Sequence, residues 1–329
     1  MERIRRILVA LHEPRRAGTA AIRRAAQLAR ATGATVELFH AVGEPRMAVQ
    51  RVGGRSILRH LSVEHSVEAA RRELERVART KILQGCRTSV TAVWDTPAHE
   101  AIVRRATATR ASLVIIGSRA RSLAGRLALR NTDWELIRSC PVPLLLARPV
   151  RARRNVVLAA VDPFHANAKP AGLDARLVDA GAGMARLLKG ELHLFHAYLP
   201  LGVIMSTSLP EPMVWDSAEA EQHHARAVER EFGRLAVKAG VAPGRRHLCM
   251  GGVATELYET VRKLGATLVV MGAVSRSRLQ RWFIGSTAER VLDGLACDAL
   301  IIKPRAGTGS RRAARVPPPR HGMNRTGNT

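Results

Sequence analysis

The segment MGAVSRSRLQRWFIGSTAERV, residues 271–291, has the pattern of a strand end, a loop with two well-separated glycines and the start of a helix. These glycines are Gly272 and Gly285. A similar segment, IGSRARSLAGRLALRNTDWEL, occupies residues 116–136 but keeps only the first of the two glycines in place. The chain therefore carries one strand, loop and helix unit twice, and the two copies differ in the loop.

Other matches extend this repeat along both halves of the chain. The tetrapeptide LFHA occurs at residues 38–41 and again at 194–197, an offset of 194 − 38 = 156. Gly117 and Gly272 are separated by 272 − 117 = 155 positions. Offsets that drift by only a few residues over a whole half indicate two homologous domains in tandem.

The domain boundaries follow from this repeat. We place the first domain at residues 1–150 and the second at residues 151–305, joined by an arginine-rich link. The remaining stretch, AGTGSRRAARVPPPRHGMNRTGNT at residues 306–329, has five arginines, no acidic residue and almost nothing to bury. We expect this basic tail to be disordered.

Strands and helices are expected to alternate within each domain. In the second domain, short apolar runs predict strands at residues 156–161, 191–198, 247–250, 266–272 and 298–304. Apolar residues at helical spacing predict helices between them, with a variable loop after the second strand. This alternation favours an α/β fold with an open, mostly parallel sheet covered by helices on both faces. Such sheets bind ligands at the carboxyl ends of their strands, where the strand order reverses.

The charge balance favours anionic partners. The 329 residues include 53 lysines and arginines against 27 acidic residues, for a net charge of +26. Nucleic acid is one such partner. However, arginines scattered over every segment and an aromatic content of 3% are equally typical of a solvated surface. Both alternatives stay open on composition alone.

Cysteine usage and hydropathy predict a cytoplasmic protein without a membrane span. Cys86, Cys140, Cys249 and Cys297 form no CxxC pair, so we expect free thiols in a reducing compartment. No apolar stretch reaches the length of about 20 residues that crosses a bilayer. The apolar run near the N-terminus is too short for a signal peptide.

Catalytic and metal-binding patterns are not evident in the sequence. It has neither a GxSxG elbow nor a GxxxxGK[ST] loop, and its neighbouring histidines lack carboxylates or cysteines at metal-ligand spacing. We therefore predict a binding protein rather than an enzyme, with no metal site of its own.

The glycine-bounded loop of the second domain suits a phosphate group. Unpaired N–H groups and the helix dipole favour an anion at a helix start, and a phosphate approaches the backbone closely where no Cβ intervenes. The alternative is that Ser286 and Glu289 form a capping box, which needs no ligand. The candidate phosphate-binding residues are Gly272, Ser275, Gly285, Ser286 and Thr287.

These motifs, with NTDWELIRSCPVP at residues 131–143 and LIIKP at 300–304, resemble tandem members of the universal stress protein family over residues 3–304. The resemblance implies two Rossmann-like domains of the adenine nucleotide alpha hydrolase type, each an open five-stranded parallel sheet sandwiched by helices. It also implies a non-enzymatic role in the bacterial stress response. The last strands of the two domains, VPLLLAR and ALIIK, would pair antiparallel within one chain, and homodimers could form in addition.

The resemblance also implies roles for individual residues. In nucleotide-binding members the loop reads Gly, two residues, Gly, nine residues, Gly, then Ser or Thr, and an aspartate that ends the first strand meets the adenine. Asp162 would then contact the adenine, and Ala197 would add a backbone contact. Ser275 replaces the middle glycine, and its Cβ narrows the approach of a phosphate. The phosphates of ATP or another adenine nucleotide, with Mg²⁺, would meet Gly272, Gly285, Ser286 and Thr287.

The first domain departs further from this pattern. His12 stands in place of the aspartate, Ala120 and Arg130 in place of the middle and last glycines, and Asn131 in place of the hydroxyl residue. We therefore hypothesise that the first domain has lost nucleotide binding and serves as a structural partner. The alternative is that Arg130 binds some other anion.

A hydrophobic ligand is a second possibility for the second domain. The stretch YLPLGVIMSTSLPEPMVW, residues 198–215, follows the carboxyl end of a predicted strand, where a pocket would open. Flexible methionines suit irregular apolar ligands. A lipid-like metabolite could bind there in place of ATP, through Ile204, Met205 and Met213. Alternatively, this stretch covers the core or packs on the other domain.

Overall fold

Strands and helices alternate along the first half of the chain. The computed structural model describes residues 3–14, 19–43, 47–52, 55–60, 62–117, 131–149, 154–164, 172–208, 218–273 and 286–304. The elements of the first half are β1 (Arg6–Ala10), α1 (Thr19–Thr32), β2 (Thr35–Val42), β3 (Met47–Val52), β4 (Arg55–His60), α2 (Val63–Ala78), β5 (Thr88–Trp94), α3 (Ala98–Ala108), β6 (Leu113–Gly117), α4 (Asn131–Ser139) and β7 (Leu144–Ala147).

The second half repeats this order with one change after its second strand. Its elements are β8 (Val156–Ala160), α5 (Leu173–Leu187), β9 (Glu191–Tyr198), α6 (Leu201–Ser208), α7 (Ala218–Lys238), β10 (Arg246–Met250), α8 (Val253–Leu264), β11 (Leu268–Gly272), α9 (Ser286–Gly294) and β12 (Asp298–Ile302). The predicted α/β fold is confirmed, whereas the predicted basic tail at residues 306–329 lies outside the described residues.

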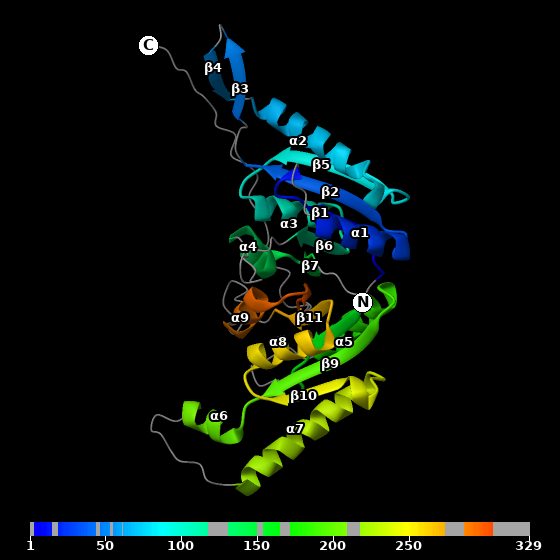
Figure 1. Ribbon diagram of the computed structural model, residues 1–329, viewed down its shortest axis with the longest axis vertical. Helices are drawn as coiled ribbons and strands as arrows, with labels where there is room; N and C mark the ends of the chain where they lie inside the picture. Colours follow the sequence, from blue (N-terminus) through cyan, green and yellow to red (C-terminus); the bar gives the residue numbers. More distant parts are fainter. Residues whose placement is uncertain are drawn as a thin grey trace, which may run out of the picture.

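Both halves contribute five parallel strands to one ten-stranded sheet, in the order β10-β9-β8-β11-β12-β7-β6-β1-β2-β5 (Figure 1). The halves meet where β7 and β12 pair antiparallel, with Leu145 opposite Leu300. This confirms the predicted pairing of the last strands. The joint removes two sheet edges that would otherwise expose unpaired backbone groups.

Helices cover the sheet on both faces. One buried apolar cluster joins the sheet to α1, α2, α5 and α7, and the other joins it to α3, α4, α8 and α9. The central strands are buried on both sides, so their sequences are continuous apolar runs rather than alternating ones. All four cysteines are free thiols, as predicted. No helix among the described residues is long and apolar enough to cross a membrane.

A buried carboxylate ties the halves together at the joint. Asp298, 1% exposed at the start of β12, accepts hydrogen bonds from Arg24 Nε at 2.7 Å and from the backbone N–H of Arg148 at 2.8 Å. Both donors belong to the first half. Burial raises the pKa of the Asp298 carboxyl, while the two donors lower it. A buried charge requires such partners.

The structure differs from the prediction in the connections that follow β2 and β9. The stretch predicted as a variable loop after β9 contains α6, whose first N–H groups, those of Leu201 and Gly202, donate to Oε2 of Glu221 at 2.8 and 3.4 Å. This cap comes from α7, so the local sequence gives no sign of it. In the first half, the same position holds the two-stranded β3–β4 hairpin (Figure 1).

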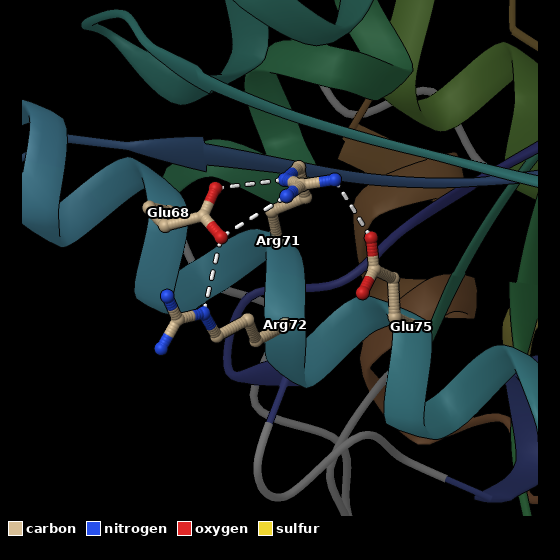
Figure 2. A network of polar contacts seen from close by, with 4 residues as sticks. All are labelled: Glu68, Arg71, Arg72 and Glu75. Carbon is tan, nitrogen blue, oxygen red and sulfur yellow. Dashed lines mark hydrogen bonds and ion pairs between the residues drawn. The ribbon is translucent and has the colours of Figure 1, made fainter.

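The exposed side of α2 shows how part of the positive charge is balanced (Figure 2). Arg71 lies 2.8 Å from carboxylate oxygens of Glu68 and Glu75, and Arg72 lies 3.0 Å from Glu68. Pairs at this spacing are typical of a solvated helix face, and each contributes little to stability. On α2, the arginines therefore fit the solvated-surface alternative. Nucleic-acid binding by the rest of the chain stays a prediction.

Candidate functional site

A cavity of about 460 Å³ opens at the carboxyl ends of β8, β9 and β11, where sequence analysis places the ligand. Four predicted residues line it: Asp162 after β8, Ala197 on β9, Gly272 at the end of β11 and Thr287 on α9. The sheet order explains their convergence, because β8 lies between β9 and β11. Ser275 and Gly285 lie outside the described residues, and Ser286 is described only as the first residue of α9.

Hydrogen bonds fix the backbone around Asp162. Its N–H donates to Oδ1 of Asp174 at 3.0 Å, and Asp174 is buried in the first turn of α5. The preceding carbonyl, that of Val161, lies 3.0 Å from Nδ1 of His196 on β9. These bonds hold the end of β8 in a defined conformation beside the cavity.

The cavity walls are mostly apolar. Phe195, Leu257 and Val291, which line the cavity, are 1 to 2% exposed. Phe164 and Leu199, 39% and 41% exposed, lie at the surface where the cavity opens. Asp162 is the single carboxylate among the described lining residues. The cavity therefore suits a ligand with a flat or flexible apolar body and few polar groups.

Two further lining residues, Ile204 and His224, come from α6 and α7. Ile204 of α6 lines the cavity as the hydrophobic-ligand hypothesis expects, whereas Met205 is not among the lining residues and Met213 lies outside the described part of the chain. His224 of α7 was not predicted as a site residue. Its ring packs edge-on against Tyr198 at 5.7 Å, and its buried Nε2 has no hydrogen-bond partner among the described residues.

Packing accounts for the glycine at position 272. A Cβ built on Gly272 would lie 3.0 Å from Cδ2 of Leu173 and 3.8 Å from Cδ1 of Leu177, both on α5. The missing side chain thus lets α5 pack closely on β11. A phosphate is not needed to explain this glycine, so its predicted phosphate role stays a prediction.

Comparison with known proteins places the chain in a family. The model of the universal stress protein family matches residues 3–148 and 156–303. The chain belongs to the universal stress protein family. Universal stress protein E of Escherichia coli strain K12 is 29% identical over 231 residues, which covers 67% of this chain and 69% of the relative.

Two solved structures share the fold over most of the chain. A Pseudomonas aeruginosa UCBPP-PA14 protein classed with this family has a TM-score of 0.66 at 24% identity and covers 92% of this chain and 94% of its own. A universal stress protein from Archaeoglobus fulgidus has a TM-score of 0.61 at 15% identity and covers 92% and 99%. At these identities the likeness concerns the arrangement of elements.

The first universal stress protein domain is built alike but is nearly filled. His40 Nδ1 lies 2.7 Å from the carbonyl oxygen of Leu11, which repeats the bond between His196 and Val161. The corresponding space, lined by Leu11, His12 and His40 among other described residues, measures about 20 Å³. The backbone frame is thus conserved between the two domains, while the cavity differs.

Side chains at two equivalent positions beside these spaces differ between the domains. Asp133 of α4, 3% exposed, occupies the position of Ala288 in the second domain (288 − 133 = 155), and its Oδ1 lies 3.6 Å from Nε2 of His12. Leu136 likewise stands in place of the smaller Val291. Ala120 and Arg130 lie outside the described residues, and Asn131 begins α4. Asp133 was not predicted as a site residue, although its alignment with Ala288 points to it.

A larger groove, of about 1210 Å³, lies at the amino ends of the second domain's strands. Its lining includes Lys189, Gly265 and Gly294, which lie at the C-terminal ends of α5, α8 and α9. The carbonyl ends of these helices carry partial negative charge, while Arg154, Lys189 and Arg262 of the lining are cationic.

The histidines on β9 take part in separate contacts. His193 Nδ1 lies 2.9 Å from Nε2 of His247, while His196 stacks on Phe232 of α7. Burial lowers the pKa of both His193 and His247, which favours their neutral forms. No three histidine, cysteine or acidic side chains gather as a metal site within the described part of the chain.

Proposed function

We propose that the second domain of this universal stress protein binds an adenine nucleotide and acts as a binding rather than a catalytic module. The observation that supports this is the convergence of Asp162, Ala197 and Thr287, from three separate elements, around one cavity. The apolar walls would hold the base, and Asp162 would accept a hydrogen bond from its amino group. The phosphates would extend toward the start of α9, where the dipole favours them and Thr287 adds a hydroxyl.

In this proposal, the nucleotide brings its own Mg²⁺. Asp162 is the single described carboxylate of the lining and is assigned to the base, so ATP with Mg²⁺ and nucleotides without it are both to be tested. We also propose the domain limits 1–150 and 151–305, with the first domain acting as a structural partner. The small volume beside His12 and Asp133 supports a loss of binding there.

Calorimetric titration of the ligand-stripped full chain tests this proposal. We expect one site per chain for ATP with Mg²⁺ or for AMP. Two sites would contradict the loss of binding in the first domain. An absence of heat, confirmed by an independent null binding assay, would contradict the nucleotide proposal as a whole.

A hydrophobic metabolite is the second candidate ligand for the same cavity. The observation that favours it is the apolar lining, to which α6 contributes Ile204. An acyl or other hydrocarbon chain would gain about 0.8 kcal/mol per buried CH₂. A fluorescent fatty-acid probe tests this: Ile204→Asp is expected to abolish its binding. If the probe does not bind the wild-type chain, this second candidate fails.

A further inference from the structure

The start of α9 forms part of the proposed phosphate site, and residues of the first domain contact this helix. α9 supplies Thr287, Ala288 and Val291 to the cavity. Arg148, which follows β7 in the first domain, donates from Nη2 to the carbonyl oxygen of Leu292 at 2.9 Å. This bond places a cation at the C-terminal end of α9, where the helix dipole is negative.

A second contact reaches the other end of the same helix. Nη2 of Arg138 on α4 lies 3.5 Å from Oε1 of Glu289, which belongs to the first turn of α9. Two arginines of the first domain therefore contact α9, one near each end.

The side chain of Arg148 is buried, and it donates its hydrogen bond to the carbonyl oxygen of Leu292 on α9. Its side chain is 6% exposed, and its Nε and Nη1 atoms have no hydrogen-bond partner among the described residues. A buried guanidinium without a directly bonded carboxylate carries a desolvation cost. The side-chain bond that the structure shows for Arg148 leads to α9, so its placement is better explained by positioning than by stability.

The repeat supplies a matched counterpart. Lys303, at 303 − 148 = 155 positions along the chain, follows β12, and its Nζ donates to the carbonyl oxygen of Arg138 at 2.7 Å. Arg138 lies near the end of α4, the helix beside the filled space of the first domain. Each last strand is thus followed by a cation that contacts the last helix of the other domain.

We propose that Arg148 is a positioning residue for the ligand site of the second domain, and that the first domain is retained because it holds α9 in place. This inference rests on the proposed function in one respect: it identifies α9 as part of the ligand site. It explains why a chain would keep a domain whose own cavity is filled.

The test compares Arg148→Met with its counterpart Lys303→Met in the full chain. We expect Arg148→Met to weaken the affinity for ATP with Mg²⁺ about tenfold, as loss of a charged hydrogen bond predicts. Lys303→Met is expected to change the affinity by less than about twofold. Arg148→Lys, which keeps the charge, is expected to restore part of the affinity. Equal losses in Arg148→Met and Lys303→Met, or unchanged affinity in Arg148→Met, would overturn the proposal.

Amide hydrogen exchange provides a readout that needs no ligand. Arg148→Met is expected to raise exchange within residues 286–294, and Lys303→Met within residues 131–139. If the wild-type chain binds no nucleotide, the proposed function fails, yet this comparison still decides the positioning role. Unchanged exchange over residues 286–294 in Arg148→Met would overturn it. Should Arg148→Met not fold, the same measurements on Arg148→Lys decide, with a smaller expected effect.

Discussion

Arg148 and Lys303 are equivalent residues of the two domains, and each donates a hydrogen bond to a carbonyl oxygen of the other domain's last helix, at 2.9 and 2.7 Å. Arg148 is buried and Lys303 is half-buried, and burial lowers the pKa of Arg148 to about 10 and that of Lys303 to about 8. The joint between the domains therefore combines an antiparallel strand pair with two reciprocal contacts between a cation and a helix end. Breaking the Arg148 contact affects α9 of the second domain, whereas breaking the Lys303 contact affects α4 of the first domain.

The lowered pKa of Lys303 predicts a stability that rises with pH. In the folded chain Lys303 releases its proton near pH 8, whereas in the unfolded chain it does so near its ordinary value of 10.5. Between these values the unfolded state binds more protons, so the free energy of unfolding increases with pH, by about 3 kcal/mol at most. Lys303→Met removes this contribution. Urea unfolding at pH 7.5, 9 and 10 measures it as a growing difference between wild type and variant.

The exposed Lys263 of α8 provides the control for this experiment. Lys263→Met is expected to leave the pH profile of unfolding parallel to that of the wild type. If the profile of Lys303→Met is also parallel to that of the wild type, the pKa of Lys303 is the same in the folded and the unfolded chain.

Asp162 and His12 occupy equivalent positions, so they test the nucleotide proposal as a pair. Asp162→Asn keeps the shape of the side chain but removes its charge, and we expect the affinity for ATP to fall about tenfold. His12→Asn in the filled space of the first domain is expected to leave the affinity within about twofold. Calorimetry on both variants measures this. Equal affinities for Asp162→Asn and the wild type would show that the charge of Asp162 does not contribute to nucleotide binding.

Local patterns were sufficient to predict most of the fold. The second strand of the second domain was predicted at residues 191–198 and is found as β9 over Glu191–Tyr198. Its apolar run, bounded by polar and turn-forming residues, determines a buried strand within a single stretch of sequence. The pairing of β7 with β12 was predicted from the family resemblance, and the Leu145 and Leu300 register confirms it.

Features that depend on distant residues were not predicted. α6 was expected to be a loop. Its capping residue, Glu221, lies on α7, so the sequence of α6 itself does not show the cap. His12, which follows β1, and Asp133 of α4 lie 3.6 Å apart beside the small space of the first domain, although they are far apart in the sequence. Arg148 has no local signature as a helix contact. In each case the deciding partner is a side chain or carbonyl from another element, which a local pattern does not contain.

The cap of α6 yields a prediction about the cavity wall. Glu221→Ala leaves the N–H groups of Leu201 and Gly202 without their acceptor, so we expect α6 to lose about 1 kcal/mol of local stability. Amide exchange of residues 201–205 measures this loss. Because Ile204 lies on α6 and lines the cavity, binding of an apolar probe is expected to weaken as well.

Glu219→Ala serves as the control, since Glu219 is an exposed residue of the first turn of α7 with no contact to α6 among the bonds of the described residues. Faster exchange over residues 201–205 in both variants would mean that the charge of the α7 start, and not the cap, stabilises α6.

The filled space of the first domain yields the final prediction. His12→Asp and Asp133→Ala together give the first domain the residues that Asp162 and Ala288 provide in the second. Removing Asp133 also avoids placing two carboxylates where His12 and Asp133 now lie 3.6 Å apart. Because Arg130 stands where the family pattern has a glycine, the complete variant adds Arg130→Gly. We expect calorimetry to report two nucleotide sites per chain for this triple variant.

The intermediate variants separate the causes of the loss. His12→Asp alone is expected to gain no site, since Asp133 lies beside His12 and would repel the new carboxylate. Binding by His12→Asp with Asp133→Ala would show that Arg130 does not block the phosphates. A triple variant that is folded but keeps one site would point to the departures it leaves unchanged, at Ala120, Asn131 and Leu136, of which Leu136 lines the space and is bulkier than Val291 at the same position. Adding Leu136→Val to the triple variant then tests apolar packing: a second site gained by this change would show that Leu136 closes the first cavity, because Ala120 and Asn131 are the same in both variants.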